Sequence, residues 1–199
     1  MLTSHVSHAF NLPLPYAFYY NVKYYTRVKP GGNVRDAVRR TAQSNPFFNK
    51  HHALLVDMSQ PSNADRMMVY DIQRQQVGFS ARVMHGEGSG AESATRFSNH
   101  LGSHKSSLGR YVIVGSYQGK FGGAYRLAGL DETNSNALAR SIVLHHSAYV
   151  REDRIGRSDG CPAVSPQALE LMKPYLQQGT LLWIYRQPET GNPRVSTTD

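Results

Sequence analysis

The 199 residues of this sequence include a single cysteine, Cys161. One cysteine excludes a disulfide within the chain and the paired-cysteine motifs of structural zinc sites. A free cysteine is usually a small, buried and inert side chain, and the alternative is a reactive thiol. The residues around Cys161 therefore have to separate these two interpretations.

Two kinds of hydrophobic segment are also missing. No run of 18 or more apolar residues is present, so the sequence predicts no membrane-spanning helix. Residues 1–22 lack a basic start, and Pro13 and Pro15 interrupt their apolar stretch, so they do not resemble a secretory signal peptide. If the protein is exported, we expect a removed signal, a different start or an unusual route.

The composition is that of an ordered, soluble globular domain. Hydrophobic residues make up 40% of the chain and charged residues 18%, which argues against disorder. Twelve tyrosines and 17 glycines favour a β-rich fold with many turns over a helical bundle. The length suits one domain of ordinary size with short extensions.

Positive charge is concentrated near the N-terminus. The net charge is +8, and residues 1–50 hold seven Lys or Arg against one acid, Asp36, which accounts for +6 of it. This suggests an anionic partner such as a wall polymer, a membrane surface or nucleic acid, although a solvated charged face is an equal alternative. No nucleic-acid-binding motif accompanies the charge, so we expect no nucleic-acid partner.

Hydrophobic patterning predicts a mainly β, β-rich α+β fold. Residues 1–46 form a basic extension with one short helix at 34–43, for which Asn33 is a suitable N-cap. A main domain covers residues 47–187, and residues 188–199 are a flexible tail. Apolar runs predict strands at 53–58, 67–72, 77–84, 111–117, 125–127, 141–145 and 180–185, the last one closing the sheet.

Helices and loops complete the predicted domain. A short helix is expected at 131–140, and another from Pro166 to about 176, with Ser165 as its N-cap. Residues 85–109 and 147–162 are long polar loops, and loops of this length inside a compact domain are usually functional. The second of these loops contains Cys161.

The segment around the cysteine points to a reactive thiol. It reads Gly156-Arg157-Ser158-Asp159-Gly160-Cys161-Pro162. Glycine beside the cysteine permits a sharp turn and frees amides to face a developing oxyanion. The predicted helix that follows would favour a thiolate through its dipole. Upstream, His145 ends an apolar strand and is a candidate general base, although a lone strand-end histidine is more often a surface group.

Taken together, these stretches resemble the L,D-transpeptidase catalytic-domain (YkuD-like) family, in its murein L,D-transpeptidase branch. The resemblance covers roughly residues 50–186. It rests on Ile142-Val143-Leu144-His145 before the cysteine motif, and on earlier matches at Asp57-Met58-Ser59-Gln60-Pro61-Ser62, His85-Gly86, Phe97-Ser98-Asn99, Ser103-His104-Lys105-Ser106-Ser107-Leu108-Gly109 and Leu127-Ala128-Gly129-Leu130.

The resemblance implies an L,D-transpeptidase-like β-sandwich or mixed sheet with a few short helices. It also implies a cysteine acyl transfer on peptidoglycan stem peptides, in the periplasm or cell envelope, without metal or organic cofactor. Carried over by position, Cys161 is the nucleophile and His145 its base. The amides of Gly160 and Cys161 would form the oxyanion hole, and Ser158 would shape the loop. A carbapenem-type β-lactam would acylate such a cysteine.

The sequence departs from the better-known members at three places. Asp159 stands where they have His, and His146 where they have Gly, Ser or Thr. Pro162-Ala163-Val164 lacks the Arg that often follows the cysteine. These departures leave the substrate contacts open, and the residues that we place on the substrate side are His85, Gly86, His146, Asp159 and Arg157.

Other interpretations stay open at this stage. The same residues would serve an L,D-carboxypeptidase if water, rather than an amine, took the acyl group. A catalytically inactive module that binds the cell wall through the basic N-terminus is a second alternative. A metal site is a third, but its candidate ligands match no usual zinc spacing; they are His85, His100, His104, His145, His146 and Cys161.

Overall fold

The computed structural model describes residues 33–119 and 122–187. The expected tail at 188–199 and most of the basic extension lie outside these residues. The division into an extension to residue 46 and a domain from 47 therefore stays a prediction. Within the described residues, no helix has the length and apolar character needed to cross a bilayer.

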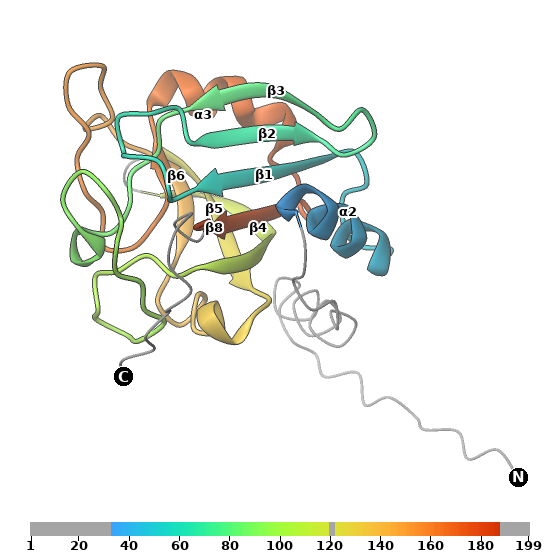
Figure 1. Cartoon of the computed structure of the whole chain (residues 1–199), viewed down its shortest axis with the longest axis horizontal. Coiled ribbons are helices and arrows are strands. Elements are labelled where there is room, and N and C mark those ends of the chain that lie inside the picture. The colour runs from blue at the N-terminus through green and yellow to red at the C-terminus, as the bar shows by residue number, and fades with distance from the viewer. Residues whose placement is uncertain (1–32, 120–121, 188–199) are drawn as a thin grey trace, which may run out of the picture.

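The described chain forms one eight-stranded mixed sheet with two short α-helices (Figure 1). This confirms the predicted β-rich fold class. The order across the sheet is β3-β2-β1-β8-β4-β5-β6-β7, and only the β1–β8 and β6–β7 pairs are parallel. The strands are β1 (His52–Asp57), β2 (Met67–Asp71), β3 (Gln76–Ala81), β4 (Gly109–Gly119), β5 (Gly122–Gly129), β6 (Val143–His146), β7 (Ala163–Val164) and β8 (Leu181–Tyr185).

The position of β8 differs from the expectation that the last strand closes the sheet. It lies in the middle, parallel to β1 on one side and antiparallel to β4 on the other. Residues 181–184 of this strand are all buried, because both faces of the sheet are covered at this point. A continuous apolar run such as Leu-Leu-Trp-Ile is typical of a strand that is buried on both faces.

A helix covers each side of the sheet. Helix α2 (Val34–Ser44) begins as predicted, with the Asn33 side chain accepting a hydrogen bond from the Arg35 amide. It buries Ala37, Val38 and Ala42 in a cluster with strand residues that include Leu181 and Trp183. Helix α3 (Pro166–Met172) is capped by Ser165, ends earlier than predicted, and contributes Leu169 and Met172 to the larger core on the opposite face.

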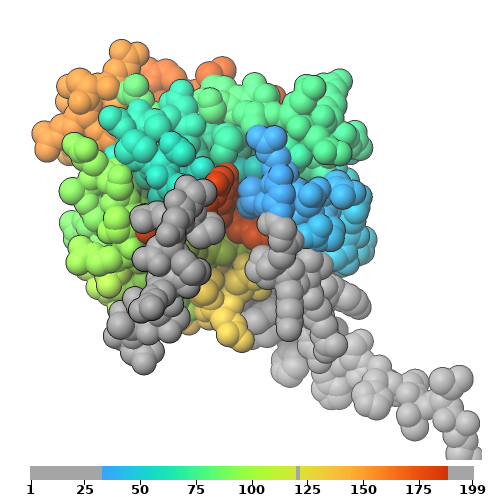
Figure 2. Space-filling model, viewed as in Figure 1, coloured from blue at the N-terminus to red at the C-terminus, as the bar shows by residue number. Residues whose placement is uncertain are grey.

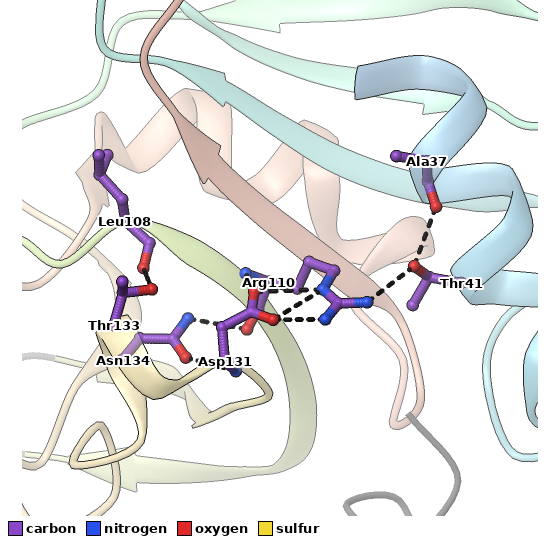
Figure 3. Close-up of polar contacts among 7 residues, drawn as sticks. All are labelled: Ala37, Thr41, Leu108, Arg110, Asp131, Thr133 and Asn134. Carbon is purple, nitrogen blue, oxygen red and sulfur yellow. Dashed lines mark hydrogen bonds and ion pairs between the residues drawn. The ribbon is translucent and has the colours of Figure 1, made fainter. Parts of the chain in front are cut away.

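An ion pair fastens α2 to the sheet (Figure 3). Arg110 of β4 is 4% exposed, and its guanidinium donates hydrogen bonds to the Asp131 carboxylate, which lies just before the 3-10 turn η2 (Glu132–Asn134). The same guanidinium donates to Thr41 Oγ1 of α2 at 3.3 Å. Asn134 closes the network by donating to the Arg110 carbonyl at 2.8 Å. One buried cation therefore links a strand, a helix and the start of the connection to β6.

The two long loops meet at one end of the sheet. Residues 85–108, which include the 3-10 turn η1 (Glu87–Ser89), and residues 147–162 both lie at the left of the molecule in Figures 1 and 2. The Met84 amide donates to the Ala163 carbonyl of β7 at 2.8 Å, and Gly86 bridges to Ser158. The stretch after β3 thus reaches the opposite edge of the sheet and supports the cysteine loop.

Candidate active site

His145 is held with a defined tautomer on β6. Its Nδ1 lies 2.8 Å from the His146 carbonyl oxygen, which can only accept, so Nδ1 carries the proton in the neutral ring. The lone pair is then on Nε2, where a base needs it. Burial lowers the pKa of His145, and the bond to the His146 carbonyl opposes this shift. The charge of the neighbouring His146 side chain lowers the pKa further. We therefore expect a neutral imidazole at pH 7.

Cys161 lies directly before β7, on the segment that runs beside β6. The parallel pair aligns His145 with Ala163, and the His145 amide donates to the Pro162 carbonyl at 3.4 Å. The thiol lies 3.8 Å from the carbonyl oxygen of Ser141, two residues before β6 begins. The structure thus brings the predicted nucleophile and base onto adjacent segments, as the parallel register requires.

The electrostatic environment of the thiol differs from the expectation of a helix-stabilised thiolate. Burial raises the pKa of Cys161, and the Asp159 carboxylate raises it as well. A hydrogen bond from the Val143 backbone and the charge of Arg140 lower it. Helix α3 begins only at Pro166 and has seven residues, and a helix dipole acts mainly within its first turn, so it offers Cys161 little support. A raised pKa favours the protonated thiol, which then needs a base to ionise.

Ser158 closes the cysteine loop on itself. Its hydroxyl donates to the Cys161 carbonyl at 2.6 Å and accepts from the Gly160 amide at 3.2 Å. Gly160 has φ +120°, a conformation that glycine adopts readily and other residues avoid. The loop-shaping role predicted for Ser158 agrees with this geometry. Because the Gly160 amide is engaged, the Cys161 amide is the better donor for an oxyanion.

Gly86 is a buried residue that packs against the backbone of the cysteine loop. It is buried, and its amide donates to Ser106 Oγ at 3.0 Å, while this hydroxyl donates to the Gly160 carbonyl at 3.3 Å. A β-carbon on Gly86 would lie 2.4 Å from the His104 carbonyl and 2.9 Å from the Gly160 α-carbon. The substrate-side interpretation of Gly86 is corrected here: its backbone packs directly on the cysteine loop.

His85 is likewise a structural residue. It is 0% exposed, its Nδ1 accepts from the buried Arg66 at 2.7 Å, and its Nε2 donates to the Gly90 carbonyl at 3.1 Å. Burial lowers the pKa of His85 to about 4, and the adjacent Arg66 contributes to the shift. A fully buried ring with both nitrogens engaged has no atom left for a substrate, so the predicted substrate contact is wrong.

The buried His85 predicts a loss of stability in mild acid. Its folded pKa of about 4 lies below the unfolded value of about 6.5, so the unfolded chain binds the extra proton between these pH values. This contribution is fully present above pH 6.5 and is lost as the pH falls towards 4. By pH 4.5 we expect a loss of about 2–3 kcal/mol, measured by urea unfolding.

The matched variants for this measurement are His85→Gln and His51→Gln. Glutamine at position 85 can accept from Arg66 and donate to Gly90 without titrating, so this part of the pH dependence should disappear. His51 is exposed, and its substitution should leave the wild-type profile. An identical profile in wild type and His85→Gln would show that His85 is not the titrating group.

The remaining predicted substrate residues lie at different places around the loop. Asp159 is exposed and accepts from His104 Nδ1 at 2.8 Å, with Glu87 3.3 Å from the same nitrogen. His146 follows His145 on the strand, so its side chain leaves from the opposite face, where it packs over Gly122. Asp159 is exposed and His146 is half-buried, so a ligand could reach both side chains.

Arg157 turns away from the cysteine towards a neighbouring cavity. Its guanidinium donates to the carbonyls of Ile155 and Gly156 and, at 3.3 Å, to that of Gly90. It lines a cavity of about 540 Å³ together with Arg96 and Arg154. A direct contact between Arg157 and the reacting group is therefore not supported, whereas a contact to a more distant part of a ligand fits this position.

The proposed metal ligands do not come together. Within residues 33–119 and 122–187, one group of His, Cys, Asp and Glu side chains is close enough to share an ion, and it consists of Glu87, His104 and Asp159. Of the sequence candidates it contains only His104. All three residues are exposed, and the hydrogen bond between His104 and Asp159 accounts for their proximity.

Sequence reasoning missed Arg140. This half-buried residue precedes β6, and its guanidinium donates to the Ser98 carbonyl at 2.9 Å, to Ser107 Oγ at 3.2 Å and to the Lys105 carbonyl. Nothing in the local sequence marks it, because its partners are 33 to 42 residues away. The nearest signal in the sequence is the serine-rich stretch 103–107, which supplies two of the hydroxyls that Arg140 contacts.

The described chain is thus a β-rich domain in which a strand histidine and a glycine-flanked cysteine lie on adjacent segments. A family model described as the L,D-transpeptidase catalytic domain matches residues 33–185. This match covers more than half of the chain, and the chain therefore belongs to the L,D-transpeptidase catalytic-domain family. The matched region includes helix α2. No curated protein sequence matches the chain.

Solved structures of L,D-transpeptidases are also similar to this chain, at low sequence identity and with TM-scores below 0.5. The enzyme from Mycobacterium smegmatis is 10% identical, with a TM-score of 0.44 over 68% of this chain and 58% of that one. An Enterococcus faecium L,D-transpeptidase mutant is 12% identical, with a TM-score of 0.44 over 71% and 52%. An L,D-transpeptidase from Stackebrandtia nassauensis is 16% identical, with a TM-score of 0.43 over 87% and 78%. The chain thus spans little more than half of the first two proteins.

Proposed function

We propose that this protein is a cysteine-dependent L,D-transpeptidase that acts on peptidoglycan stem peptides in the cell envelope. The observation that carries the proposal is the His145–Cys161 arrangement. A neutral histidine, with its proton fixed on Nδ1 by a backbone carbonyl, stands on the strand beside the loop that presents the only thiol. Membership of the L,D-transpeptidase catalytic-domain family supports the substrate class.

The reaction begins with proton transfer from Cys161 to Nε2 of His145. The thiolate attacks the carbonyl of the L-centred residue at stem position three, and the developing oxyanion accepts hydrogen bonds from the loop amides. The carbon–nitrogen bond to the terminal D-residue breaks, and His145 returns the proton to the departing amine. The product is a thioester on Cys161 and a free D-amino acid.

A second amine then takes the acyl group. His145 removes a proton from this amine as it attacks the thioester, the carbon–sulfur bond breaks, and the thiolate leaves and regains the proton. A stem peptide as acceptor gives a cross-link. Water as acceptor gives a shortened stem, which is the L,D-carboxypeptidase alternative. Ser158 keeps Cys161 and its amide in place throughout through its two hydrogen bonds.

The parts of the stem peptide that do not react would lie along the loop. Asp159 and His146 are exposed or half-buried near the ends of the two reacting segments, and we assign them substrate contacts. Arg157 and its neighbours Arg96 and Arg154 line a cavity that suits the carboxylates of an acidic peptide. The basic N-terminal extension remains our candidate for contact with an anionic wall polymer or membrane surface.

The direct test uses purified disaccharide-tetrapeptide with the wild type and Cys161→Ala. We expect the wild type to form a dimer or to release the terminal D-residue, and Cys161→Ala to do neither, as read by mass spectrometry. A dimer identifies a transpeptidase, and a tripeptide without dimer identifies a carboxypeptidase. Unchanged tetrapeptide with the wild type, together with binding to intact sacculi, would favour the inactive wall-binding module.

A carbapenem offers an independent test of the thiol. Acylation opens the β-lactam ring, so the intact protein gains the whole mass of the drug on Cys161. We expect this adduct in the wild type and none in Cys161→Ala. His145→Gln should slow acylation by about 10²–10³-fold, because the thiol then lacks its base. Equal adduct formation by wild type and Cys161→Ala would contradict the assignment.

A further inference from the structure

The guanidinium of Arg140 is a half-buried cation without a carboxylate partner. It donates to four oxygens of the loop at residues 98–107, and all four are uncharged: the carbonyls of Ser98 and Lys105 and the hydroxyls of Ser103 and Ser107. No ion pair of Arg140 is present in the part of the chain that the structure describes. Arg140 therefore forms no direct ion pair among the described residues, and Asp159 is the acidic group whose charge reaches the same thiol.

This charge lies beside the reactive thiol. A β-carbon on Gly160 would be 2.9 Å from Arg140 Nη2, so the guanidinium rests against the backbone of the residue before Cys161. On the other side, the thiol lies 3.8 Å from the carbonyl oxygen of Ser141, the residue after Arg140. Two separate contacts, one through Gly160 and one through Ser141, thus place Arg140 next to Cys161.

The serine loop keeps the guanidinium in this position. Ser107 accepts from Arg140 at 3.2 Å, and its hydroxyl lies 2.6 Å from the hydroxyl of the fully buried Tyr111. The Tyr111 hydroxyl in turn donates to the Ser107 carbonyl at 2.8 Å. A network that is anchored in the core leaves the cation little freedom to move towards solvent.

We propose that Arg140 is a positioning residue whose uncompensated charge stabilises the thiolate of Cys161, while its four hydrogen bonds fix the 98–107 loop beside the cysteine. The inference rests on the proposed function only in assigning Cys161 as the nucleophile. Arg140 does not contact substrate, because both N–H groups of each terminal nitrogen are already directed at the loop.

Opposing influences act on the pKa of Cys161, and Arg140 supplies one of them. Burial and Asp159 raise the pKa of Cys161, which would leave too little thiolate for attack near neutral pH. The charge of Arg140 and the Val143 amide act in the opposite direction. The Val143 hydrogen bond is the larger of these two influences, and the charge of Arg140 adds to it in favour of the thiolate.

The test measures the pH dependence of alkylation by iodoacetamide at the single cysteine. We expect Arg140→Gln to raise the apparent pKa of Cys161 by about one unit, and hence to slow alkylation about tenfold at pH 7. Arg140→Lys keeps the charge and should give a profile close to that of the wild type. Arg74→Gln, which removes an exposed charge at the β2–β3 turn, should leave the profile unchanged.

The two arginine variants separate charge from structure. If the role of Arg140 is purely structural, both variants lose loop contacts and muropeptide turnover, but the alkylation profile of Arg140→Gln keeps the wild-type midpoint pH. This outcome would overturn the proposal. If Arg140→Gln does not fold, Arg140→Lys decides: a shift of one unit despite the retained charge would also overturn it. Alkylation needs no muropeptide, so an inactive protein with the expected shift refutes the proposed function alone.

Discussion

Replacing Asp131 with alanine is expected to lower the free energy of unfolding by about 3–5 kcal/mol, measured by chemical denaturation. The side chains of Arg110 and Asp131 are only 5% and 18% exposed. Without its partner, the Arg110 guanidinium stays in a largely buried site, and its bond to Thr41 cannot replace the carboxylate (Figure 3). The large effect comes from the unpaired buried charge more than from the lost attraction.

Two controls define the cause of this loss. Glu170→Ala removes an exposed carboxylate from its pair with Lys173 and should cost less than about 1 kcal/mol, because solvent screens that pair. The double variant Arg110→Met with Asp131→Leu removes both buried charges and should recover part of the stability. If Asp131→Ala cost no more than Glu170→Ala, the buried pair would not be holding α2 to the sheet.

Substituting Gly86 with alanine should destabilise the protein by roughly 3 kcal/mol or more and impair Cys161 at the same time. The new methyl would lie 2.4 Å from the His104 carbonyl and 2.9 Å from the Gly160 α-carbon. Both neighbours are backbone atoms, so no side chain can rotate to relieve the contact, and overpacking of this kind forces the backbone to shift. The shift would displace the loop that carries the thiol.

Gly78→Ala is the matched control for this substitution. Gly78 lies in β3, and a β-carbon there meets nothing within 4 Å, so its stability should change by about 0.5 kcal/mol or less. Thermal unfolding measures the first effect, and the rate of carbapenem acylation measures the second. A Gly86→Ala protein that unfolds and acylates like Gly78→Ala would show that the loop tolerates displacement from below.

The sequence predicted the elements of this fold better than their arrangement. Capping and periodicity located the helix after Asn33 and the helix after Ser165, because these signals are local. The place of β8 depends on which partner strands lie on either side of it, and no local pattern encodes this. The signal available in the sequence was the continuous apolar run Leu-Leu-Trp-Ile, whose residues are all buried in the structure.

The candidate site shows the same division. His145 and Cys161 could be proposed as a pair from the sequence, because a strand end and a glycine-flanked cysteine are chemical signals in themselves. His85 was misplaced on the substrate side, because its burial depends on Arg66, 19 residues earlier in the chain. Arg140 was missed because its significance lies in contacts with a distant loop. Residues that act through others are visible only once the chain is folded.

The central place of β8 has a consequence for how the domain is made. Strand β8 pairs with β1 on one side and with β4 on the other, and it is the last of the described strands to be synthesised. The sheet therefore cannot be completed until residues 181–185 have left the ribosome. Pairings between such distant segments form slowly. A nascent chain that stalls before Leu181 carries two open strand edges, and each is a template for intermolecular pairing. Synthesis through the last strand is therefore the step at which assembly competes with aggregation.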